Sequence, residues 1–364
     1  MKQKYVGLIP SHEAQIHFLD HLAVICHVLD APLLLVKELE FNIAKAFYPE
    51  VDIRFIPYEE FSSDYLVSNF DVMILSDLWN KAAFHEKYGS LEKKYEKSLR
   101  HVHCPHGFSD KGYYLHKCAY EDILLMYGQN MLDLLKYYGV SQHLSHYVIT
   151  GNFRYSYYKK FQGFYQDVIK KEVLAKFDRA RPLILYAPTW QDSDQATTFF
   201  DMCSMILDRL PEDYNMVVKT HPRLEWDDPM LYYQILRKYK DKKNILFLNE
   251  FPLIYPLLAC VDIYIGDMSA IGYDYLVFNK PMFFLNAKGR NVINDRALLY
   301  SCGVEIFPDQ MPDIYAIIAD SLPRDKERFS QFRQALYDYT FGTERSFEEI
   351  KEEVSTCLLR EYRE

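Results

Sequence analysis

The chain lacks the features that mark membrane-spanning and secreted proteins. None of its apolar runs approaches the roughly 20 residues that a membrane-spanning helix requires. Its seven cysteines are an odd number without a C-x-x-C pair, and most lie inside apolar segments, so we interpret them as reduced core residues. The N-terminus, residues 1–4, runs into a strand-like segment without the apolar stretch of a signal peptide. We therefore expect a cytoplasmic protein that is soluble or at most attached to a surface.

An excess of positive charge is also missing. The chain has 42 Lys and Arg against 51 Asp and Glu, a formal net charge of −9. Nucleic acids and anionic bilayers are held by concentrated Lys and Arg, so this balance argues against a nucleic-acid-binding protein and against a generic electrostatic hold on membranes. Basic side chains do cluster in the middle of the chain, at Lys159, Lys160, Lys170, Lys171, Lys176, Arg179 and Arg181. We interpret this cluster as a solvated helix face rather than a membrane-contact patch.

The chain does have length and a repeated order of elements. Its 364 residues favour two domains. Strand-like apolar runs alternate with helix-like stretches, which is typical of parallel sheets covered by helices. The predicted strands of the first half are residues 6–10, 32–36, 52–57, 71–75, 101–104, 123–126 and 147–149. Those of the second half are residues 183–187, 216–219, 245–248, 262–265 and 282–285, separated by helix-length segments such as 229–239 and 270–278.

The boundary between the two domains is predicted where strand character is lost. Residues 154–181 are charged, aromatic and helix-prone, so we assign them to a helical connector. Residues 1–153 then form an N-terminal Rossmann-like domain, and residues 182–364 a C-terminal one that includes helices after Pro308. Two doubly wound α/β domains joined in this way, with a helical C-terminus, are the layout of a GT-B type transferase, in which the domains face each other across a cleft.

His106 stands at the end of a predicted strand, followed directly by Gly107. In open α/β sheets, ligands collect at the carboxyl ends of the strands, and a glycine permits a tight turn there. A histidine in this place can take a proton from a hydroxyl, because its ordinary pKa lies near neutral pH. The alternative is a histidine that is simply hydrogen-bonded at a strand end. Lys111, a few residues later, adds a cation that can meet phosphate.

His221 follows a predicted strand in the second half, within Lys219-Thr220-His221-Pro222-Arg223. The proline restricts His221 to an extended conformation, which keeps its side chain outside any helix. Lys219, His221 and Arg223 can all carry positive charge, and this suits an anionic diphosphate. The alternative is a surface turn with ordinary basic residues. The two histidines together suggest a site between the domains.

The segment from residue 262 to 281 predicts a strand, a turn and a helix start. The strand ends at Gly266, and Asp267 or Ser269 can cap the next helix. The free N–H groups of that helix and the Ser269 hydroxyl can bind phosphate. Capping alone would also explain both side chains. The order of strand end, cap and helix favours the phosphate-binding interpretation.

The first strand of the second half leads into Ala187-Pro188-Thr189-Trp190. Thr189 can donate a hydrogen bond to a phosphate or to a nucleotide. The next residues, Asp192-Ser193-Asp194, resemble a D-x-D metal motif, but we favour a solvated turn and assign no metal ligand.

Taken together, these motifs resemble the CDP-glycerol glycerophosphotransferase family, the teichoic acid primases and polymerases. The resemblance covers about residues 100 to 290 and includes Glu250, Pro256-Leu257-Leu258, Asp262, Asp267-x-Ser269, Asp274 and Lys280-Pro281. It implies a GT-B fold and the transfer of a polyol phosphate, glycerol phosphate above all, from a CDP-activated donor to a hydroxyl. The acceptor is expected to be a saccharide or lipid-linked saccharide, with release of CMP at the inner face of the cell membrane.

The resemblance also implies roles for single residues. His106 and His221 match histidines of the family's His-Gly and His-Pro motifs and are expected to be catalytic. Donor or phosphate binding is expected of Lys111, Thr189, Lys219, Arg223, Glu250, Asp267, Ser269 and Asp274. The CDP-activated donor is a substrate, so no resident cofactor is predicted, and metal dependence stays open.

The chain departs from the family in one of its motifs, and its short N-terminal region resembles the single-transfer primases more than the long polymerases. It has Asp267-Met268-Ser269-Ala270 where Asp-Tyr-Ser-Ser is common, so one hydroxyl that would face phosphate is absent. Two other functions therefore remain open. One is a GT-B glycosyltransferase or epimerase that uses a UDP-sugar, and the other is a non-catalytic nucleotide-binding protein of the same fold.

Overall fold

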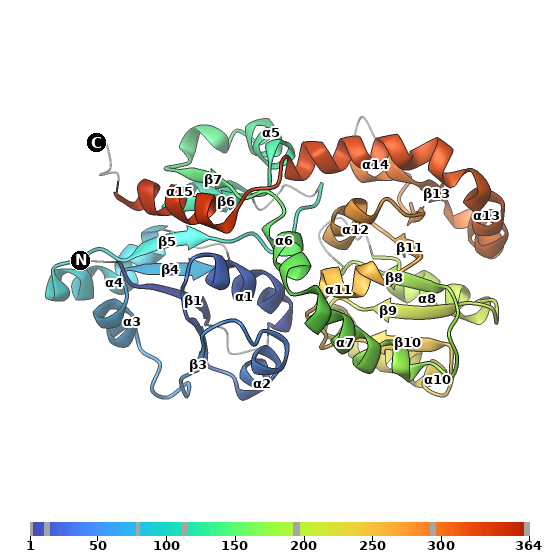
Figure 1. The fold of residues 1–364 in the computed structure, drawn as a ribbon, viewed down its shortest axis with the longest axis horizontal. Helices are drawn as coiled ribbons and strands as arrows, with labels where there is room; N and C mark the ends of the chain where they lie inside the picture. The colour runs from blue at the N-terminus through green and yellow to red at the C-terminus, as the bar shows by residue number, and fades with distance from the viewer. Residues whose placement is uncertain are drawn as a thin grey trace. The chain divides into compact units, whose positions relative to one another are not determined.

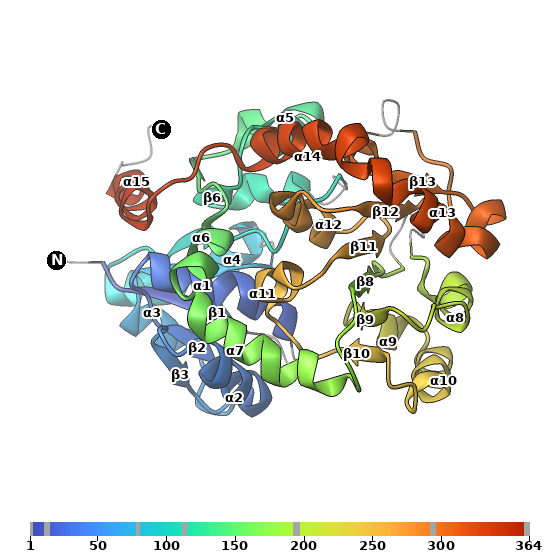
Figure 2. The same ribbon diagram turned by 45° about the vertical axis from the view of Figure 1, so that its right-hand side comes forward.

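The computed structural model describes residues 3–10, 15–77, 81–110, 115–191, 197–291 and 296–359, with the backbone alone at 81–85. The chain divides into two compact units (Figure 1). Unit 1 comprises Met1–Tyr157 and Tyr339–Glu364, and unit 2 comprises Tyr158–Asp338. Each unit is a sheet with helices on both faces (Figure 2).

The sheet of unit 1 has the strand order β3-β2-β1-β4-β5-β6-β7, and all of its pairs are parallel. Its strands are β1 (Tyr5–Ile9), β2 (Leu33–Leu35), β3 (Ile53–Phe55), β4 (Val72–Leu75), β5 (Arg100–His103), β6 (Ile123–Met126) and β7 (Tyr147–Ile149). The helices are α1 (Leu19–Val28), α2 (Glu38–Phe47), α3 (Ser63–Asn69), α4 (Lys81–Tyr95), α5 (Gln129–Tyr137) and α15 (Phe347–Leu359). The strand order reverses between β1 and β4, which is where ligands of such sheets usually bind.

The sheet of unit 2 is also parallel, in the order β10-β9-β8-β11-β12-β13. Its strands are β8 (Leu183–Ala187), β9 (Asn215–Lys219), β10 (Ile245–Leu248), β11 (Ile263–Gly266), β12 (Met282–Leu285) and β13 (Val304–Ile306). The helices are α7 (Gln162–Glu172), α8 (Phe199–Asp208), α9 (Leu224–Asp227), α10 (Pro229–Tyr239), α11 (Ile254–Ala259), α12 (Ala270–Tyr275) and α13 (Ile314–Ser321). Two helices, α6 (Phe153–Lys160) and α14 (Asp325–Phe341), run from one unit into the other.

The predicted α/β class with two doubly wound parallel sheets is confirmed. Each predicted strand is present, with ends that differ by at most two residues, because buried parallel strands are nearly continuous apolar runs. The structure adds β13, which the sequence did not predict. This strand has only three residues, two of them half-buried and one of them Glu305, so it carries little apolar signal.

The C-terminal segment departs from the predicted domain division. Residues 339–359, which the sequence analysis assigns to the second domain, pack in unit 1. Tyr339 donates to Asp133 at 3.0 Å, and the Asn130 amide donates to the Thr340 hydroxyl at 3.0 Å. Gly128 leaves room for this segment, because a Cβ there would lie 2.5 Å from the Thr340 carbonyl oxygen. These contacts join residues some 200 positions apart, so no local pattern announces them.

Glu40 on α2 is a buried carboxyl group of unit 1. Its Oε1 accepts a hydrogen bond from the Gln15 backbone at 2.5 Å, and its Oε2 has no partner among the described residues. Burial raises the pKa of Glu40 to about 7. The ordinary pKa of a glutamate is about 4.3. The folded chain therefore keeps this proton at pH values where the unfolded chain has lost it, and stability falls as the pH rises between these two values.

We expect Glu40→Gln to stabilise unit 1 at pH 8, by on the order of 2 kcal/mol, and to change little at pH 4.5. The glutamine keeps the acceptor for Gln15 but has no proton to lose. Urea unfolding at the two pH values measures the difference, and Glu38→Gln at an exposed position of the same helix is the control. An equal effect at both pH values would show that Glu40 does not titrate in this range.

Candidate functional site

His106 lies in the loop after β5, at the carboxyl edge of the unit 1 sheet. Its Nδ1 atom is 3.1 Å from the carbonyl oxygen of Ser76, which follows the neighbouring strand β4. A carbonyl oxygen can only accept, so Nδ1 is the protonated nitrogen of the neutral ring. The Nε2 atom then keeps its lone pair. This contact therefore assigns the Nδ1–H tautomer, in which Nε2 can accept a proton.

The surroundings of His106 favour its neutral form. The side chain is exposed to solvent and packs against Phe18, with ring centroids 5.0 Å apart. Desolvation by the surrounding protein lowers the pKa of His106, while the Ser76 carbonyl and the Asp77 carboxylate oppose this shift. The imidazole is therefore accessible to water on one side, while the protein around it excludes water from the other. At neutral pH the ring is able to accept a proton.

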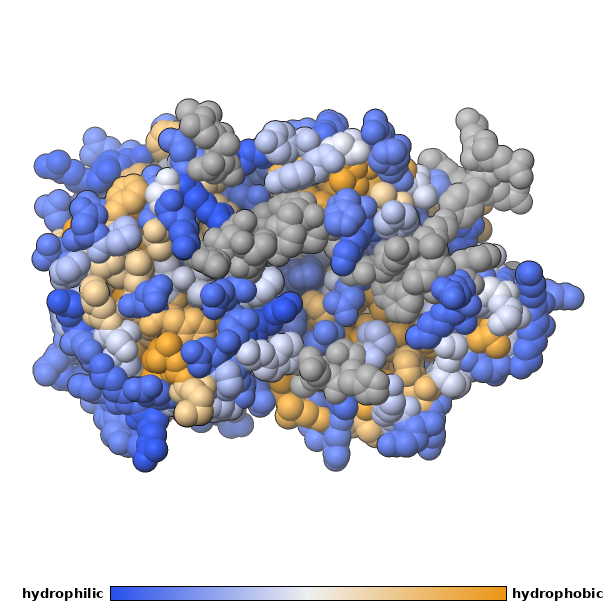
Figure 3. Space-filling model, turned by 180° about the vertical axis from the view of Figure 1, so that it is seen from behind, coloured by the Kyte–Doolittle hydropathy of each residue, from blue (hydrophilic) through white to orange (hydrophobic). Residues whose placement is uncertain are grey.

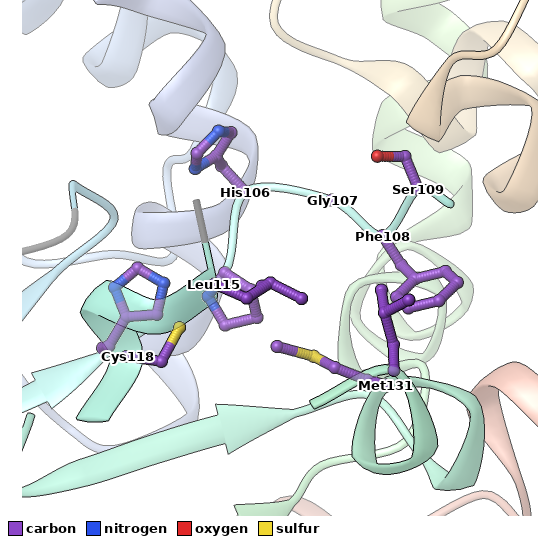
Figure 4. Close-up of a pocket in the computed structure, with 10 residues that line it drawn as sticks. His106, Gly107, Phe108, Ser109, Leu115, Cys118 and Met131 are labelled. Carbon is purple, nitrogen blue, oxygen red and sulfur yellow. The ribbon is translucent and has the colours of Figure 1, made fainter. Parts of the chain in front are cut away.

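A small apolar pocket lies on the other side of the His106 loop. It is lined by side chains of Phe108, Leu115, Cys118, Met131 and Leu134, together with loop residues 105–107, Ser109 and His103. The imidazole of His106 points away from the apolar side chains (Figure 4). Its ring is therefore not part of the core beneath the loop.

Two further histidines accompany His106, and sequence reasoning missed both. His17 precedes α1, with its ring centroid 6.3 Å from that of His106. His21 lies inside α1, where burial first, and then Arg154, His106 and His17, lower its pKa well below the ordinary value. His17 lies just before this helix and His21 inside it, and the sequence shows only helix-like spacing in this segment. Only the topology brings this helix to the edge that carries His106.

Lys111 and Asp192-Ser193-Asp194 lie outside the described residues. The predicted role of Lys111 thus stays a prediction. The same holds for the solvated turn that we favour at residues 192–194.

In unit 2, His221 lies in the loop after β9. Its Nδ1 accepts a hydrogen bond from the Arg223 backbone at 3.2 Å, so the neutral ring carries its proton on Nε2 and can donate it. The Trp190 ring, from the loop after β8, has its centroid 6.1 Å from that of His221 and 4.2 Å from Cζ of Arg223. Trp190 directly follows Thr189 in the same motif, but it is not among the site residues that the sequence predicts. The Trp190 ring thus connects the loop after β8 with the loop after β9.

Lys219 and Glu250 flank this cluster. Lys219, the last residue of β9, is buried, with Nζ 3.5 Å from the Thr220 carbonyl and 3.4 Å from the Asn249 carbonyl. These long contacts hold the ammonium group at the edge of the sheet. Glu250 follows β10 and is exposed. Strands β9 and β10 are neighbours, so both residues lie at the edge that carries His221.

Asp267 has an internal role. It is 1% exposed, and its Oδ1 accepts from the Thr189 backbone at 2.7 Å. Its Oδ2 accepts from the backbone and the hydroxyl of Thr198, at 3.1 and 3.0 Å. One carboxylate thereby joins the loop after β11 to the loop after β8 and to the start of α8. These contacts are those of a residue that positions Thr189.

Ser269 and Asp274 also have protein partners. Ser269 caps α12, and its hydroxyl accepts from the Ile271 backbone at 3.4 Å. Helix α12 has only six residues, so its dipole is small. Asp274 is buried and accepts from the Tyr255 hydroxyl at 2.9 Å. Capping alone accounts for the observed contact of Ser269.

Arg290 is a cation near Ser269 that the sequence analysis did not select. Its Nη1 lies 3.0 Å from the sulfur of Met268, beside the start of α12. Asn286, which follows β12, accepts from the Arg290 backbone N–H and donates to its carbonyl, both at 2.9 Å. The side chain of Asn286 therefore fixes the loop that carries Arg290. A lone arginine in a loop gives no sequence signal.

A search of the described residues for clusters of three or more His, Cys, Asp or Glu that suit a metal ion finds none. Within the same residues, no helix has both the length and the apolar character needed to cross a bilayer. One face of the molecule shows apolar patches scattered among hydrophilic side chains (Figure 3), as is usual for protein surfaces.

The sequence is similar to those of known proteins. Residues 143–340, more than half of the chain, match the family described as CDP-Glycerol:Poly(glycerophosphate) glycerophosphotransferase. The teichoic acid poly(ribitol-phosphate) polymerase of Bacillus spizizenii is 27% identical over 128 residues, 34% of this chain and 20% of that protein. The teichoic acid glycerol-phosphate primase of Bacillus subtilis is 28% identical over 105 residues, 29% of this chain and 25% of that protein. The matches thus span a quarter or less of these relatives.

Solved structures share the fold. The wall teichoic acid polymerase TagF superimposes with a TM-score of 0.65 and 13% identity, over 97% of this chain and 89% of that chain. Anabaena HepE, solved with UDP-glucose, gives a TM-score of 0.54 and 12% identity, over 98% and 99% of the two chains. At this identity the likeness concerns the fold alone. It confirms the predicted GT-B type architecture.

The internal role of Asp267 predicts a loss of stability when it is changed. Asp267→Asn replaces one acceptor oxygen by an N–H₂ group that faces a backbone donor, and we expect it to cost unit 2 on the order of 2–3 kcal/mol. Ser269→Ala, the matched control at the cap, is expected to cost about 1 kcal/mol. Chemical unfolding measures both. An Asp267→Asn protein of normal stability with weakened donor binding would instead place Asp267 in the ligand site.

Proposed function

Because the chain belongs to the CDP-glycerol:poly(glycerophosphate) glycerophosphotransferase family, we propose that it transfers a polyol phosphate from a CDP-activated donor to an acceptor hydroxyl. Glycerol phosphate is the proposed group, and CMP is the leaving product. The observation that carries this proposal is the His106–Ser76 contact, which leaves Nε2 as a proton acceptor at a sheet edge open to solvent. A hydroxyl that attacks phosphorus needs such an acceptor.

Unit 1 is proposed to supply the base. The acceptor oxygen forms a bond to the phosphorus that bears the polyol, and its proton passes to Nε2 of His106. The bond between that phosphorus and the bridging oxygen breaks, and the electron pair leaves with CMP. The lowered pKa of His106 supports this role, because the ring is neutral at the pH of the cytoplasm.

Unit 2 is proposed to hold the donor. Lys219, Arg223 and Arg290 supply positive charge at the carboxyl edge of its sheet, and His221 offers an N–H donor at Nε2. These groups suit the diphosphate and the negative charge that develops on departing CMP. Ser269 and Thr189 are proposed to donate their hydroxyl protons to phosphate, and Glu250 to contact the polyol or the nucleotide.

The acceptor is proposed to be a saccharide or a lipid-linked saccharide in the synthesis of a cell-surface polymer such as teichoic acid or capsule. The reaction would then take place at the cytoplasmic face of the membrane. A contact with anionic lipid would use the basic cluster near α7, because the stretch that carries Lys170 and Lys171 also carries Phe164 and Leu174, which are 40% and 43% exposed.

A panel of nucleotide ligands tests the donor class. We expect CDP-glycerol or CDP-ribitol to raise the melting temperature, and CMP to be released when a saccharide-lipid acceptor is added. Thermal shift and chromatography of the released nucleotide are the measurements. Release of UDP from UDP-sugars would identify a glycosyltransferase instead. Binding of nucleotides without release under any condition would identify a non-catalytic binding protein.

His106→Ala is expected to lower turnover by about 10²–10⁴-fold and to leave donor affinity unchanged, since general-base assistance contributes this much. In the unchanged protein, kcat/KM should rise with pH and reach half its plateau below pH 6.5, the ordinary pKa of histidine. Initial rates of CMP release from pH 5 to 8 measure both. The control is His143→Ala, at an exposed histidine remote in sequence from this loop. Full activity of His106→Ala would rule out the assigned base.

A further inference from the structure

We propose that Tyr127 is a positioning residue that fixes His106 for proton transfer, an inference that rests on the proposed function. Tyr127 follows β6 directly, and it is 1% exposed. Its hydroxyl donates to the Pro105 carbonyl at 2.9 Å and accepts from the Gly107 backbone N–H at 3.1 Å. A single hydroxyl thus bonds the backbone on both sides of His106.

The remaining lone pair of this hydroxyl faces His21 on α1. The distance from the oxygen to Nδ1 of His21 is 3.4 Å. A tyrosine hydroxyl has one proton and two lone pairs, and the loop uses the proton and one lone pair. The other lone pair can accept from Nδ1–H of His21. Burial keeps the pKa of His21 well below its ordinary value, so this ring is a neutral donor that adds no charge beside the base.

The ring of Tyr127 is itself held by two aromatic side chains. Phe153 stacks on it with a centroid distance of 6.2 Å and an interplanar angle of 8°. Phe341, at the end of α14, meets it edge-on at 5.5 Å and 74°. The hydroxyl therefore cannot follow the loop if the loop shifts. Strand β6, helix α1 and the C-terminal segment of unit 1 all contribute to holding Pro105 and Gly107 in place.

The loop needs such a clamp because of its backbone shape. Gly107 has a φ angle of +112°, which a glycine adopts without strain but from which it can also leave easily. Without the hydroxyl, the Pro105 carbonyl and the Gly107 N–H lose a shared partner. A shift of the loop would weaken the contact of His106 with Ser76, which sets the tautomer. Misplacement of a catalytic group by about 1 Å can cost on the order of 100-fold in rate.

Tyr127→Phe removes the hydroxyl and keeps the ring. We expect kcat to fall on the order of tenfold, with an unchanged KM for the CDP-activated donor. Tyr95→Phe is the matched control, because Tyr95 of unit 1 also loses a hydroxyl bond, to Asp64 at 2.8 Å, but lies outside this network. It should keep normal activity. Normal kcat in Tyr127→Phe would overturn the proposal.

A double-mutant cycle separates positioning from general damage. In a His106→Ala background, Tyr127→Phe should cause no further loss of activity, because it acts through His106. A further loss of the same size would overturn the proposal. His21→Leu, which removes only the third contact, should cause a smaller loss that also disappears in this background. If Tyr127→Phe does not fold, His21→Leu still tests the proposal. An equal loss of activity from His21→Leu in the unchanged protein and in the His106→Ala background would count against the proposal.

A spectroscopic measurement needs no activity. In protein with ¹⁵N-labelled histidine, the His106 signals are identified by their absence in His106→Ala. We expect the Nδ1–H tautomer in the unchanged protein and a mixture of tautomers in Tyr127→Phe, whereas an unchanged tautomer would contradict the proposal.

Full activity of His106→Ala would refute the assigned base and the proposed function. An inactive His106→Ala beside a fully active Tyr127→Phe would refute the role of Tyr127 alone.

Discussion

Parallel pairing of every strand is the constraint on which the rest of the structure depends. It brings the carboxyl ends of all strands in a unit to one edge, so loops that are distant in sequence become neighbours there. In unit 1 this edge joins Ser76 after β4, His106 after β5 and Tyr127 after β6, on strands that are adjacent in the sheet. In unit 2 the loops after β9, β8, β11 and β12 meet in the same way.

The backbone groups of loops at such an edge have few hydrogen-bond partners within the loops. In each unit, one buried side chain provides such partners. In unit 2 the Asp267 carboxylate accepts from three donors on two other segments. In unit 1 the Tyr127 hydroxyl bonds Pro105 and Gly107 of the His106 loop and lies 3.4 Å from Nδ1 of His21. Buried polar groups without partners are costly, so each side chain makes one loop arrangement much more stable than its alternatives. Rigid loops are what a preorganised site requires.

The sequence was most informative where burial controls composition. Buried parallel strands are apolar runs, so their positions could be read directly, and His106 and His221 could be placed at strand ends. The short, half-buried β13 could not be predicted, and neither could the return of residues 339–359 to unit 1. A local pattern contains no information about a partner 200 residues away. His21, Tyr127 and Arg290 belong to no sequence motif, so no local pattern selects them either.

Sequence alone also cannot tell a carboxylate that faces a ligand from one that faces the protein. Asp267 stands at a strand end and Asp274 near the end of α12, and the resemblance to the family predicts donor binding for both. The structure shows them bonded to Thr189 and Thr198 and to Tyr255. Because such residues hold the backbone that surrounds a site, they belong to the same motifs as the residues that contact ligand.

His106, the proposed base, has the neutral ring of His21 and the carboxyl group of Asp77 in its surroundings. A charged neighbour would change its pKa strongly, since electrostatic interactions are only weakly screened in a partly desolvated site. His21 is buried and neutral, and its Nδ1 lies 3.4 Å from the hydroxyl oxygen of Tyr127. Desolvation lowers the pKa of His106, and the Ser76 carbonyl and Asp77 oppose part of this shift, whereas burial lowers the pKa of His103 to about 3. A histidine with a pKa that low is neutral but a poor proton acceptor, so solvent access and these two oxygens support the proposal that His106, rather than His103, is the base.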